Sequence, residues 1–253
     1  MDNSMDRYQG EVAVVTGASS GIGWAIARSL AARGLRVALL ARRRDRLLQL
    51  VKEIETNGGS ATAFETDLTR PREIERTFSE LRQALGPVRV VINNAGLGHS
   101  APLVSGQTEH WAEMLQVNVL ALCVCTREAV SDMQANGEWG QVVHISSMSA
   151  HRVPEGSGVY SATKFAVRSL TESLRRELRA LKSQVRVASV SPGFVETEFA
   201  EKYHRDKQKA EETYSAYRVL SAEDIARSVL YILEQPDHVQ VHDLLLRPTE
   251  QIS

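Results

Sequence analysis

The sequence lacks the features on which secreted, membrane-spanning and nucleic-acid-binding proteins depend. Its 30 basic and 31 acidic residues leave a formal net charge of −1, so no overall field attracts nucleic acid or an anionic membrane. No apolar run approaches the roughly 18 residues of a membrane span. Residues 1–10 are polar, without the apolar core of a secretory signal, and residues 250–253 match no sorting motif. We therefore expect a cytoplasmic protein that binds neither nucleic acid nor membrane.

Cysteine is scarce as well. The two cysteines, Cys123 and Cys125, are separated by one residue, and no histidine ligand pattern surrounds them. Side chains two residues apart on a helix point to different faces, which is unsuited to a shared metal ion or a disulfide. The sequence predicts two free thiols in a reducing compartment and no metal site.

What is present is an alternation of short β-branched runs with longer amphipathic runs. This alternation is typical of a parallel sheet covered by helices. The 253 residues contain no repeat and no linker, so we predict one α/β domain over residues 1–253, a doubly wound parallel sheet of about seven strands. The predicted strands are Val12–Thr16, Arg36–Leu40, Thr62–Glu65, Val88–Asn93, Gln141–Ser146, Val185–Val190 and Val239–Leu246. The predicted helices are Gly21–Arg33, Asp45–Glu55, Pro71–Leu85, His110–Gln134, Gly158–Leu181 and Ala222–Glu234.

One long charged segment, Phe194–Tyr217, interrupts the alternation. Such an insertion after a strand is either a solvated surface segment or a loop that covers a substrate. Its position after the sixth predicted strand leaves both interpretations open.

A glycine-rich loop, Thr16–Gly23, follows the first predicted strand and opens the first predicted helix. Glycines there allow a tight turn, and the helix N-terminus can receive a pyrophosphate. The spacing is Gly-x-x-x-Gly-x-Gly, which differs from the common Gly-x-Gly-x-x-Gly pattern. A purely structural turn is the alternative.

The second predicted strand runs into three arginines rather than an acid. Enzymes that use NAD place a carboxylate there to bind the ribose 2′-hydroxyl, whereas guanidinium groups bind a 2′-phosphate. The first acid after the strand is Asp45, so we expect NADP(H), with Arg42 as the first choice of phosphate ligand and Arg43 as the second. Solvated arginines that open a helix are the alternative.

Tyr160 and Lys164 lie four residues apart in a predicted helix and therefore share one face. An ammonium beside a phenol stabilises the phenolate and should lower the tyrosine pKa from about 10 toward neutrality. The same spacing also occurs in ordinary amphipathic helices. Asn118 is a polar residue in an otherwise apolar helical stretch, which by itself indicates a satisfied buried amide.

Three patterns in order along the chain carry a resemblance to a known family. The glycine spacing, the run Asn93-Asn94-Ala95-Gly96 and the Tyr-x-x-x-Lys pair together resemble the short-chain dehydrogenase/reductase (SDR) family, from about Glu11 to the seventh strand. The resemblance implies a Rossmann-type fold and a dimer or tetramer. The run Ser146–Ser149 and a late Arg-Pro-Thr-Glu-Gln segment are similar to a subgroup of NADP-dependent reductases of carbonyl compounds, β-hydroxy acids and hydroxysteroids.

The resemblance also assigns roles. Ser147 stands thirteen residues before Tyr160, the family's interval between its catalytic serine and tyrosine. By this likeness Tyr160 is the acid/base, Ser147 positions the substrate oxygen, Lys164 binds the nicotinamide ribose and Asn118 holds a water that relays protons. The residues that the likeness and the arginines assign to the cofactor are Gly17, Ser19, Ser20, Gly21, Ile22, Gly23, Arg42, Arg43, Asp67, Leu68, Asn94, Ala95, Gly96, Tyr160, Lys164, Pro192, Gly193, Val195 and Thr197.

These observations predict an NADP(H)-dependent enzyme that interconverts a carbonyl and a secondary alcohol. An NAD-linked alcohol dehydrogenase and a dinucleotide-binding regulator without catalysis are the alternatives. The substrate is a small molecule that the sequence does not name. Its expected neighbours are His99, Met148, His151, Val153, Phe194 and Phe199. Arg152 and Lys202 could pair with a carboxylate, but the sequence favours solvation at the surface for each.

Overall fold

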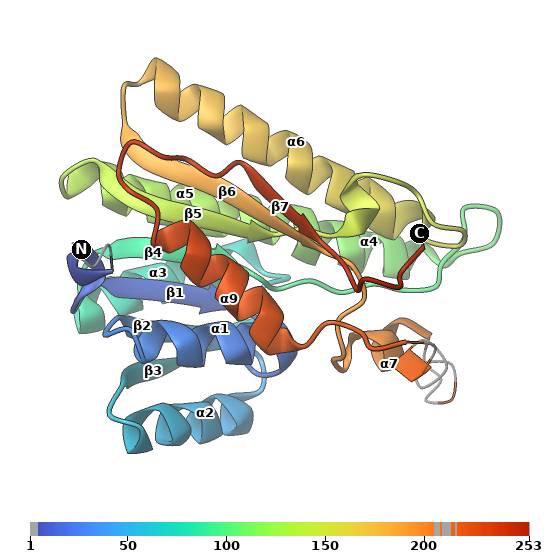
Figure 1. Ribbon diagram of the computed structural model, residues 1–253, viewed down its shortest axis with the longest axis horizontal. Coiled ribbons are helices and arrows are strands. Elements are labelled where there is room, and N and C mark those ends of the chain that lie inside the picture. Colours follow the sequence, from blue (N-terminus) through green and yellow to red (C-terminus); the bar gives the residue numbers. More distant parts are fainter. Residues whose placement is uncertain (1–4, 205–207, 209–213, 216, 253) are drawn as a thin grey trace.

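A computed structural model describes residues 5–204, 208, 214–215 and 217–252 of the chain. In this part, seven parallel strands form one sheet in the order β3-β2-β1-β4-β5-β6-β7 (Figure 1). The chain moves outward from β1 to β3 and returns to the other side of β1 with β4, so the predicted doubly wound sheet is confirmed. The strands are β1 (Val12–Thr16), β2 (Arg36–Ala41), β3 (Ser60–Glu65), β4 (Val88–Asn93), β5 (Trp139–Ile145), β6 (Gln184–Pro192) and β7 (Asp243–Leu246).

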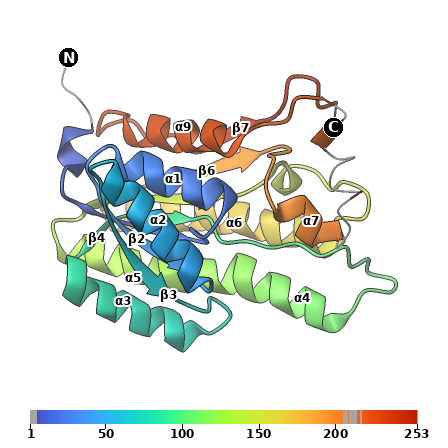
Figure 2. The same cartoon turned by 90° about the horizontal axis from the view of Figure 1, so that it is seen from below.

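Helices cover both faces of the sheet (Figures 1 and 2). Helices α1, α2 and α9 pack on one face, and α3, α5 and α6 pack on the other. The helices are α1 (Gly21–Ala31), α2 (Arg44–Thr56), α3 (Pro71–Leu85), α4 (Thr108–Leu115), α5 (Leu122–Ala135), α6 (Gly158–Ala180), α7 (Phe199–His204) and α9 (Ala222–Leu233), with short 3₁₀ turns at Asp6–Tyr8 and Met148–Ala150.

Strand β1 shows why these residues form a central strand. All five of its side chains are buried. Ala13 and Val15 enter the core under α1 and α9, whereas Val14 enters the core under α3 and α5. Because alternate side chains point to opposite faces, a continuous apolar run is what a strand covered on both sides requires.

Several predicted boundaries agree with the structure. The bounds of β1, β4 and α3 are those predicted, and Pro71 occupies the first turn of α3. Ser221 and Asp224 form the expected capping box before α9, in which each side chain binds the other residue's backbone N–H. Strand β7 is shorter than predicted, since only Asp243–Leu246 pairs with β6. Pairing rather than side-chain pattern sets the start of this edge strand.

The predicted helix His110–Gln134 contains a change of helix type that the sequence does not reveal. Between α4 and α5 the residues Gln116–Ala121 form π-helix. The run Thr108–Ala135 is long and apolar enough to cross a membrane by length and composition, with a mean hydropathy of 1.2, but half of the apolar window is buried in the fold. Cys125 is buried and Cys123 half-buried, both as free thiols, as predicted.

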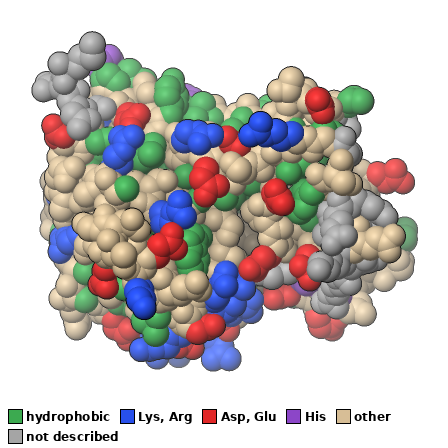
Figure 3. Space-filling model, turned by 60° about the horizontal axis from the view of Figure 1, so that its bottom comes forward, with side chains coloured by type: hydrophobic (Ala, Val, Ile, Leu, Met, Phe, Trp, Pro, Cys, Tyr) green, Lys and Arg blue, Asp and Glu red, His purple; other side chains and the backbone are tan. Residues whose placement is uncertain are grey.

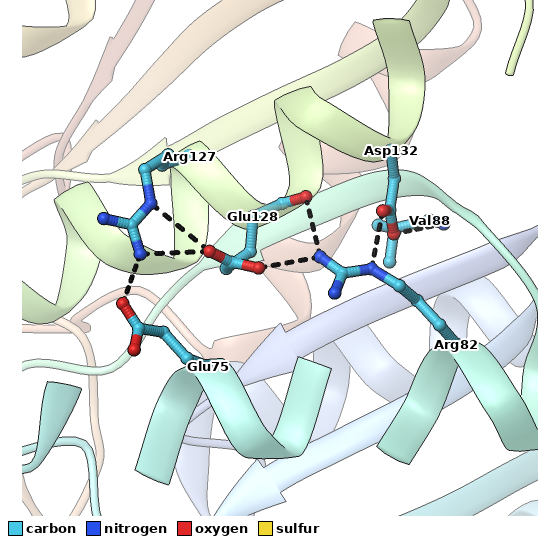
Figure 4. Close-up of polar contacts among 6 residues, drawn as sticks. All are labelled: Glu75, Arg82, Val88, Arg127, Glu128 and Asp132. Atoms are coloured by element: carbon cyan, nitrogen blue, oxygen red, sulfur yellow. Dashed lines mark hydrogen bonds and ion pairs between the residues drawn. The ribbon is translucent and has the colours of Figure 1, made fainter. Parts of the chain in front are cut away.

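A chain of ion pairs joins α3 to α5 (Figure 4). Arg82 Nε donates to Asp132 Oδ1 at 2.6 Å, and Arg82 Nη2 donates to Glu128 Oε2 at 2.8 Å. The second oxygen of Asp132 accepts the backbone N–H of Val88, the first residue of β4. Partial burial raises the pKa of Glu128, but the hydrogen bonds from Arg82 and Arg127 outweigh it and leave that pKa below its ordinary value.

We expect Asp132→Asn to destabilise the fold by about 2 kcal/mol. The amide has one acceptor oxygen where the carboxylate has two, so it cannot serve both Arg82 and the Val88 N–H, and it leaves the partly buried Arg82 with Glu128 as its one charge partner among the described residues. Urea unfolding followed by far-UV circular dichroism measures the change. Glu80→Gln, which removes an exposed carboxylate from the surface pair with Arg76, is the matched control and should change stability by less than about 0.5 kcal/mol. Equal effects of the two substitutions would contradict the role given to Asp132.

The surface shows no large area of one charge on the face in Figure 3, where acidic and basic side chains are interspersed. This distribution fits the near-zero net charge of the chain. It offers no basic stripe of the kind that tracks a nucleic-acid backbone on that face.

Candidate active site

The glycine loop between β1 and α1 is held against the end of β4. Asn94 Nδ2 donates to the carbonyl of Thr16 at 2.9 Å, and Thr16 Oγ1 accepts the backbone N–H of Asn94 at 3.0 Å. Gly17 has φ +67°, and a Cβ on Gly23 would lie 2.5 Å from Asn94 Nδ2. Both positions therefore require glycine, one for its conformation and one for its close neighbours.

A cavity of about 440 Å³ opens above this loop, at the carboxyl edge where the strand order reverses. This edge is the usual ligand site of open α/β sheets. The cavity brings together predicted cofactor residues from five segments of the chain: Gly17, Ser19, Ser20, Gly21, Ile22, Arg42, Arg43, Asp67, Leu68, Asn94, Ala95, Gly96 and Thr197. Gly23 lies beneath the loop, against Asn94.

The two candidate arginines have different surroundings in this cavity. Arg43 Nη2 donates to Ser20 Oγ at 2.7 Å and to Ser19 Oγ at 3.1 Å, which ties the end of β2 to the glycine loop. Its Nη1 pairs with Glu198 at 3.1 Å. Arg42 is exposed and acts electrostatically on Asp67. Both guanidinium groups line the cavity, so the order of preference between them stays a prediction.

Asp67 both stabilises a turn and lines the cavity. Its carboxylate accepts hydrogen bonds from the Thr69 backbone N–H at 3.0 Å and the Thr69 hydroxyl at 2.8 Å, as a turn residue does. It also lines the cavity. Partial burial raises its pKa, but the Thr69 hydrogen bonds and the charges of Arg42 and Arg70 outweigh that effect, so the pKa lies below its ordinary value.

The predicted catalytic group assembles from β5, α6 and the π-helical segment. Ser147 follows β5 as the cap of the short 3₁₀ turn, where its Oγ accepts the backbone N–H of Ser149 at 3.0 Å. The Ser147 hydroxyl interacts with the phenol of Tyr160, which comes from the first turn of α6. Lys164 Nζ lies 5.8 Å from the centre of the Tyr160 ring and donates to the Ile145 carbonyl at 3.0 Å.

Asn118 lies inside the π-helical segment and is 2 % exposed. Its Nδ2 donates to the Leu97 carbonyl at 2.8 Å and to Thr163 Oγ1 at 3.0 Å, and its Oδ1 accepts the Leu97 N–H at 2.9 Å. Asn118 is therefore the satisfied buried amide that its sequence context indicates. It contacts Thr163, the residue before Lys164. Single π-turns of this kind are frequent at functional sites.

The structure corrects one electrostatic expectation. Lys164 was expected to lower the Tyr160 pKa, but removal from water raises the pKa of Tyr160 to about 12, with the Ser147 hydroxyl opposing the rise. The reason is geometric, since the Lys164 ammonium is directed to the Ile145 carbonyl rather than to the phenol oxygen. Burial in turn lowers the pKa of Lys164 to about 8.

Behind Lys164 lies a buried polar chain that sequence reasoning missed. His144 Nδ1 lies 2.9 Å from Thr171 Oγ1 on α6, and its Nε2 lies 3.2 Å from Thr126 Oγ1 on α5. Burial and the charge of Lys164 lower the pKa of His144 to about 3, so the ring is neutral. The sequence signal that could have revealed this polar chain is a histidine within an otherwise apolar run of predicted strand β5.

A second cavity of about 430 Å³ adjoins the first and is lined by Ser147, Tyr160 and Lys164 of the catalytic group, whereas Asn118 does not line it. Its apolar wall is aromatic, because Tyr160 lies 5.5 Å from Phe199 and 6.2 Å from Tyr203 between ring centres. Of the expected substrate neighbours, Met148, Phe194 and Phe199 line it. The other lining residues assigned in advance are Ser147, Tyr160, Lys164, Pro192, Gly193, Val195 and Thr197.

Three expected substrate neighbours lie elsewhere. His99 pairs with Glu113 at 2.8 Å, His151 pairs with Asp243 at 3.1 Å, and the Val153 side chain is exposed. The predicted loop, residues 194–217, contributes its first part and Tyr214 to the cavity. Residues 205–207, 209–213 and 216 lie outside the described residues. Tyr203 and Gln251 also line the cavity. Neither was assigned to the site from the sequence, although Tyr203 lies in the predicted loop and Gln251 ends the Arg-Pro-Thr-Glu-Gln segment.

Comparisons with known proteins agree with this architecture. A short chain dehydrogenase family model matches residues 11–208. Dehydrogenase/reductase SDR family member 11 of Gallus gallus is 47% identical over 98% of this chain and 100% of its own length, and the farnesol dehydrogenase of Aedes aegypti is 37% identical over 96% and 98%. A closed serine dehydrogenase complexed with NADP+ superposes with a TM-score of 0.89 at 30% identity, covering 95% of this chain and 96% of that one. The chain is therefore an oxidoreductase of the short-chain dehydrogenase/reductase family.

Proposed function

We propose that this chain interconverts a carbonyl compound and a secondary alcohol with NADP(H), using Tyr160 as the acid and base. The observation that carries the proposal is the meeting of the Ser147 hydroxyl, the Tyr160 phenol and the buried Lys164 ammonium in one cavity. That cavity shares Ile22, Asn94, Gly96, Thr197 and Phe199 with the cavity of the glycine loop. A substrate carbonyl and a nicotinamide could therefore lie next to each other.

The residues of the first cavity fit a phosphorylated dinucleotide. The N-terminus of α1 and the Ser19 and Ser20 hydroxyls offer hydrogen-bond donors, and Arg42 and Arg43 offer guanidinium groups for a 2′-phosphate. The serine dehydrogenase at 30% identity was solved with NADP+. When bound, the reduced dinucleotide would supply a hydride.

The protein side of the reaction is proton transfer and orientation. Tyr160 keeps its proton at neutral pH, because its pKa is raised to about 12, and it donates that proton to the substrate oxygen. The Ser147 hydroxyl donates a hydrogen bond to the same oxygen and stabilises its developing charge. Lys164 would bind the nicotinamide ribose, and Asn118 would hold a water that returns protons toward Lys164. In the oxidative direction the same proton transfer runs in reverse, from the alcohol hydroxyl to the Tyr160 oxygen.

The test of this function is NADPH absorbance with a panel of β-keto acids, aldehydes, diketones and ketosteroids. We expect oxidation of NADPH by at least one class. Tight NADPH binding without turnover of any class would favour the non-catalytic regulator instead. Turnover that proceeds only with NADH would favour the NAD-linked dehydrogenase.

We expect Arg43→Leu to raise the Kd for NADPH by about 10-fold to 100-fold and the Kd for NADH by no more than about 5-fold, the latter because Arg43 also bonds the Ser19 and Ser20 hydroxyls of the glycine loop. Loss of a charge-assisted contact to the 2′-phosphate has this size, and NADH has no such phosphate. Nucleotide fluorescence measures both constants. Arg42→Leu is tested in parallel, because either guanidinium could provide the contact.

Glu198→Gln is a control that should change the Kd for NADPH in the opposite direction. Glu198 competes for Arg43, so its neutral form should tighten NADPH binding by up to about 5-fold, the size of an exposed ion pair. Equal catalytic efficiency with the two cofactors, unaffected by either arginine substitution, would refute the NADP(H) preference.

We also propose that the chain forms a homo-oligomer, either a dimer or a tetramer, and that it is located in the cytoplasm. Three apolar side chains are exposed on α4, the π-helical segment and α6. The exposed fractions of Leu115, Leu120 and Phe165 are 50%, 43% and 40%. Exposed apolar side chains of this kind are typical of surfaces that a second copy covers. The two free thiols are compatible with a reducing compartment. Sedimentation as a monomer at micromolar concentration would refute the oligomer.

A further inference from the structure

Arg152 lies in the wall of the substrate cavity with an unsatisfied guanidinium nitrogen. Its Nε is buried and has no hydrogen-bond partner. Among the described residues no carboxylate forms an ion pair with it, although Glu155 also lines the cavity. A buried donor without a partner costs free energy, so this guanidinium is incompletely satisfied, and its terminal nitrogens are the atoms that a ligand in the cavity would contact.

Comparison with the other arginines of the described chain sets Arg152 apart. Three more arginines have a buried Nε without a hydrogen bond. Each of these has a carboxylate or an aromatic ring beside its guanidinium: Asp237 for Arg7, Glu11 for Arg89 and Trp24 for Arg46. For Arg152 the structure shows neither. Its positive charge lies near Tyr217, where it opposes the rise that burial causes in the pKa of that phenol.

The segment that carries Arg152 is held on both sides. The preceding residue, His151, lies 3.1 Å from Asp243 of β7 through its Nε2. Beyond Arg152, the Ser157 hydroxyl donates to the Pro154 carbonyl at 2.6 Å. Because these contacts restrain the backbone, the ordering cost of binding a ligand is confined mainly to the Arg152 side chain.

The other residues of the cavity indicate what kind of ligand would bind beside Arg152. Tyr160, Phe199 and Tyr203 form an aromatic wall, and Met148 and Phe194 add apolar surface. A volume of about 430 Å³ suits a ligand with a sizeable apolar body. A carboxylate matches the planar guanidinium with paired, charge-assisted hydrogen bonds.

We propose that Arg152 is a specificity-determining residue that binds a substrate carboxylate, so that the substrates are oxo acids with an apolar or aromatic body and the corresponding hydroxy acids. The inference rests on the proposed carbonyl–alcohol reaction at Tyr160. That reaction is unchanged by it: the carbonyl carbon gains a hydride, its oxygen gains a proton, and the carboxylate keeps its charge.

The test compares aryl oxo acids of increasing chain length with their methyl esters, using NADPH as the reductant. For the wild type we expect a higher kcat/KM for at least one acid than for its ester. Arg152→Met should lower kcat/KM for that acid by about 10-fold to 100-fold, mainly through KM, and leave the ester within about 2-fold. Arg152→Lys should recover part of the loss. Arg176→Met, which removes an exposed arginine of α6, is the control and should change neither substrate.

A binding measurement separates failure of this inference from failure of the proposed function. Calorimetry with unreactive aryl alkanoates and their amides, on the protein saturated with NADP+, should show carboxylate binding that Arg152→Met weakens by the same factor. If acids and esters are reduced equally, or both ligands lose affinity equally in Arg152→Met, the carboxylate site is refuted while the reaction stands. If nothing is reduced but carboxylate binding still depends on Arg152, the proposed function is refuted and the site stands.

Discussion

Replacement of Tyr160 by phenylalanine should lower kcat by about 10²-fold to 10⁴-fold, the usual contribution of a positioned acid. The substitution removes one hydroxyl and keeps the ring that contacts Phe199 and Tyr203, so the fold and the cavity should persist. The Kd for NADPH, measured by fluorescence, should change by less than about 3-fold. Steady-state NADPH absorbance measures the loss of turnover.

Tyr203→Phe is the matched comparison for this result. It removes a second hydroxyl from the same cavity, one that donates to the Gly156 carbonyl. We expect a loss of less than about 10-fold in kcat, because this hydroxyl is given no part in proton transfer. Full activity of Tyr160→Phe, or equal losses in both variants, would remove Tyr160 from the catalytic role.

Replacement of Lys164 by methionine should abolish most turnover and at the same time stabilise the fold. The Lys164 side chain is 5 % exposed, and burial lowers its pKa from 10.5 to about 8. A shift of this size corresponds to about 3 kcal/mol of unfavourable free energy for the buried ammonium. Loss of the hydrogen bond to the Ile145 carbonyl destabilises the variant by about 1 kcal/mol and offsets part of this gain. We therefore expect the free energy of unfolding to rise by about 2 kcal/mol at pH 7.

The sign of this effect gives it a distinctive pH dependence. Below pH 8 the lysine carries its proton in both states, so the folded protein bears the whole cost. Between about pH 8 and 10.5 the unfolded state binds more protons than the folded state, and the stability of the wild type therefore rises with pH. The advantage of Lys164→Met should shrink over the same interval.

Urea unfolding of the protein at pH 7, pH 9 and pH 10.5 measures this advantage. Lys52→Met removes an exposed lysine from α2 and is the control, with an expected change below about 0.5 kcal/mol at every pH. A Lys164→Met variant that is less stable than the wild type at pH 7, or whose difference is independent of pH, would contradict the assignment. A gain in stability with loss of turnover is expected where a charge is kept buried for function.

The comparison of predicted and observed elements shows where local pattern suffices. Strand β1 and helix α3 have their predicted bounds because their apolar periods, and Pro71 at the start of α3, are local signals. The start of β7 was placed too early, since pairing with β6 decides it. The π-helical segment Gln116–Ala121 was not foreseen either, because one extra residue in a helical turn leaves no distinct apolar pattern.

For the site, Ser147, Tyr160, Lys164 and Asn118 were assigned through the family resemblance that the motifs carry, and the chain brings all four to one end of the sheet. Helix geometry by itself placed only Tyr160 and Lys164 on one face without coordinates. The direction of the Tyr160 pKa shift, the partners of Arg43 and the unsatisfied Arg152 became evident only from contacts between distant segments. These properties depend on which polar groups lose water and which partners replace it, and that depends on how the folded chain packs.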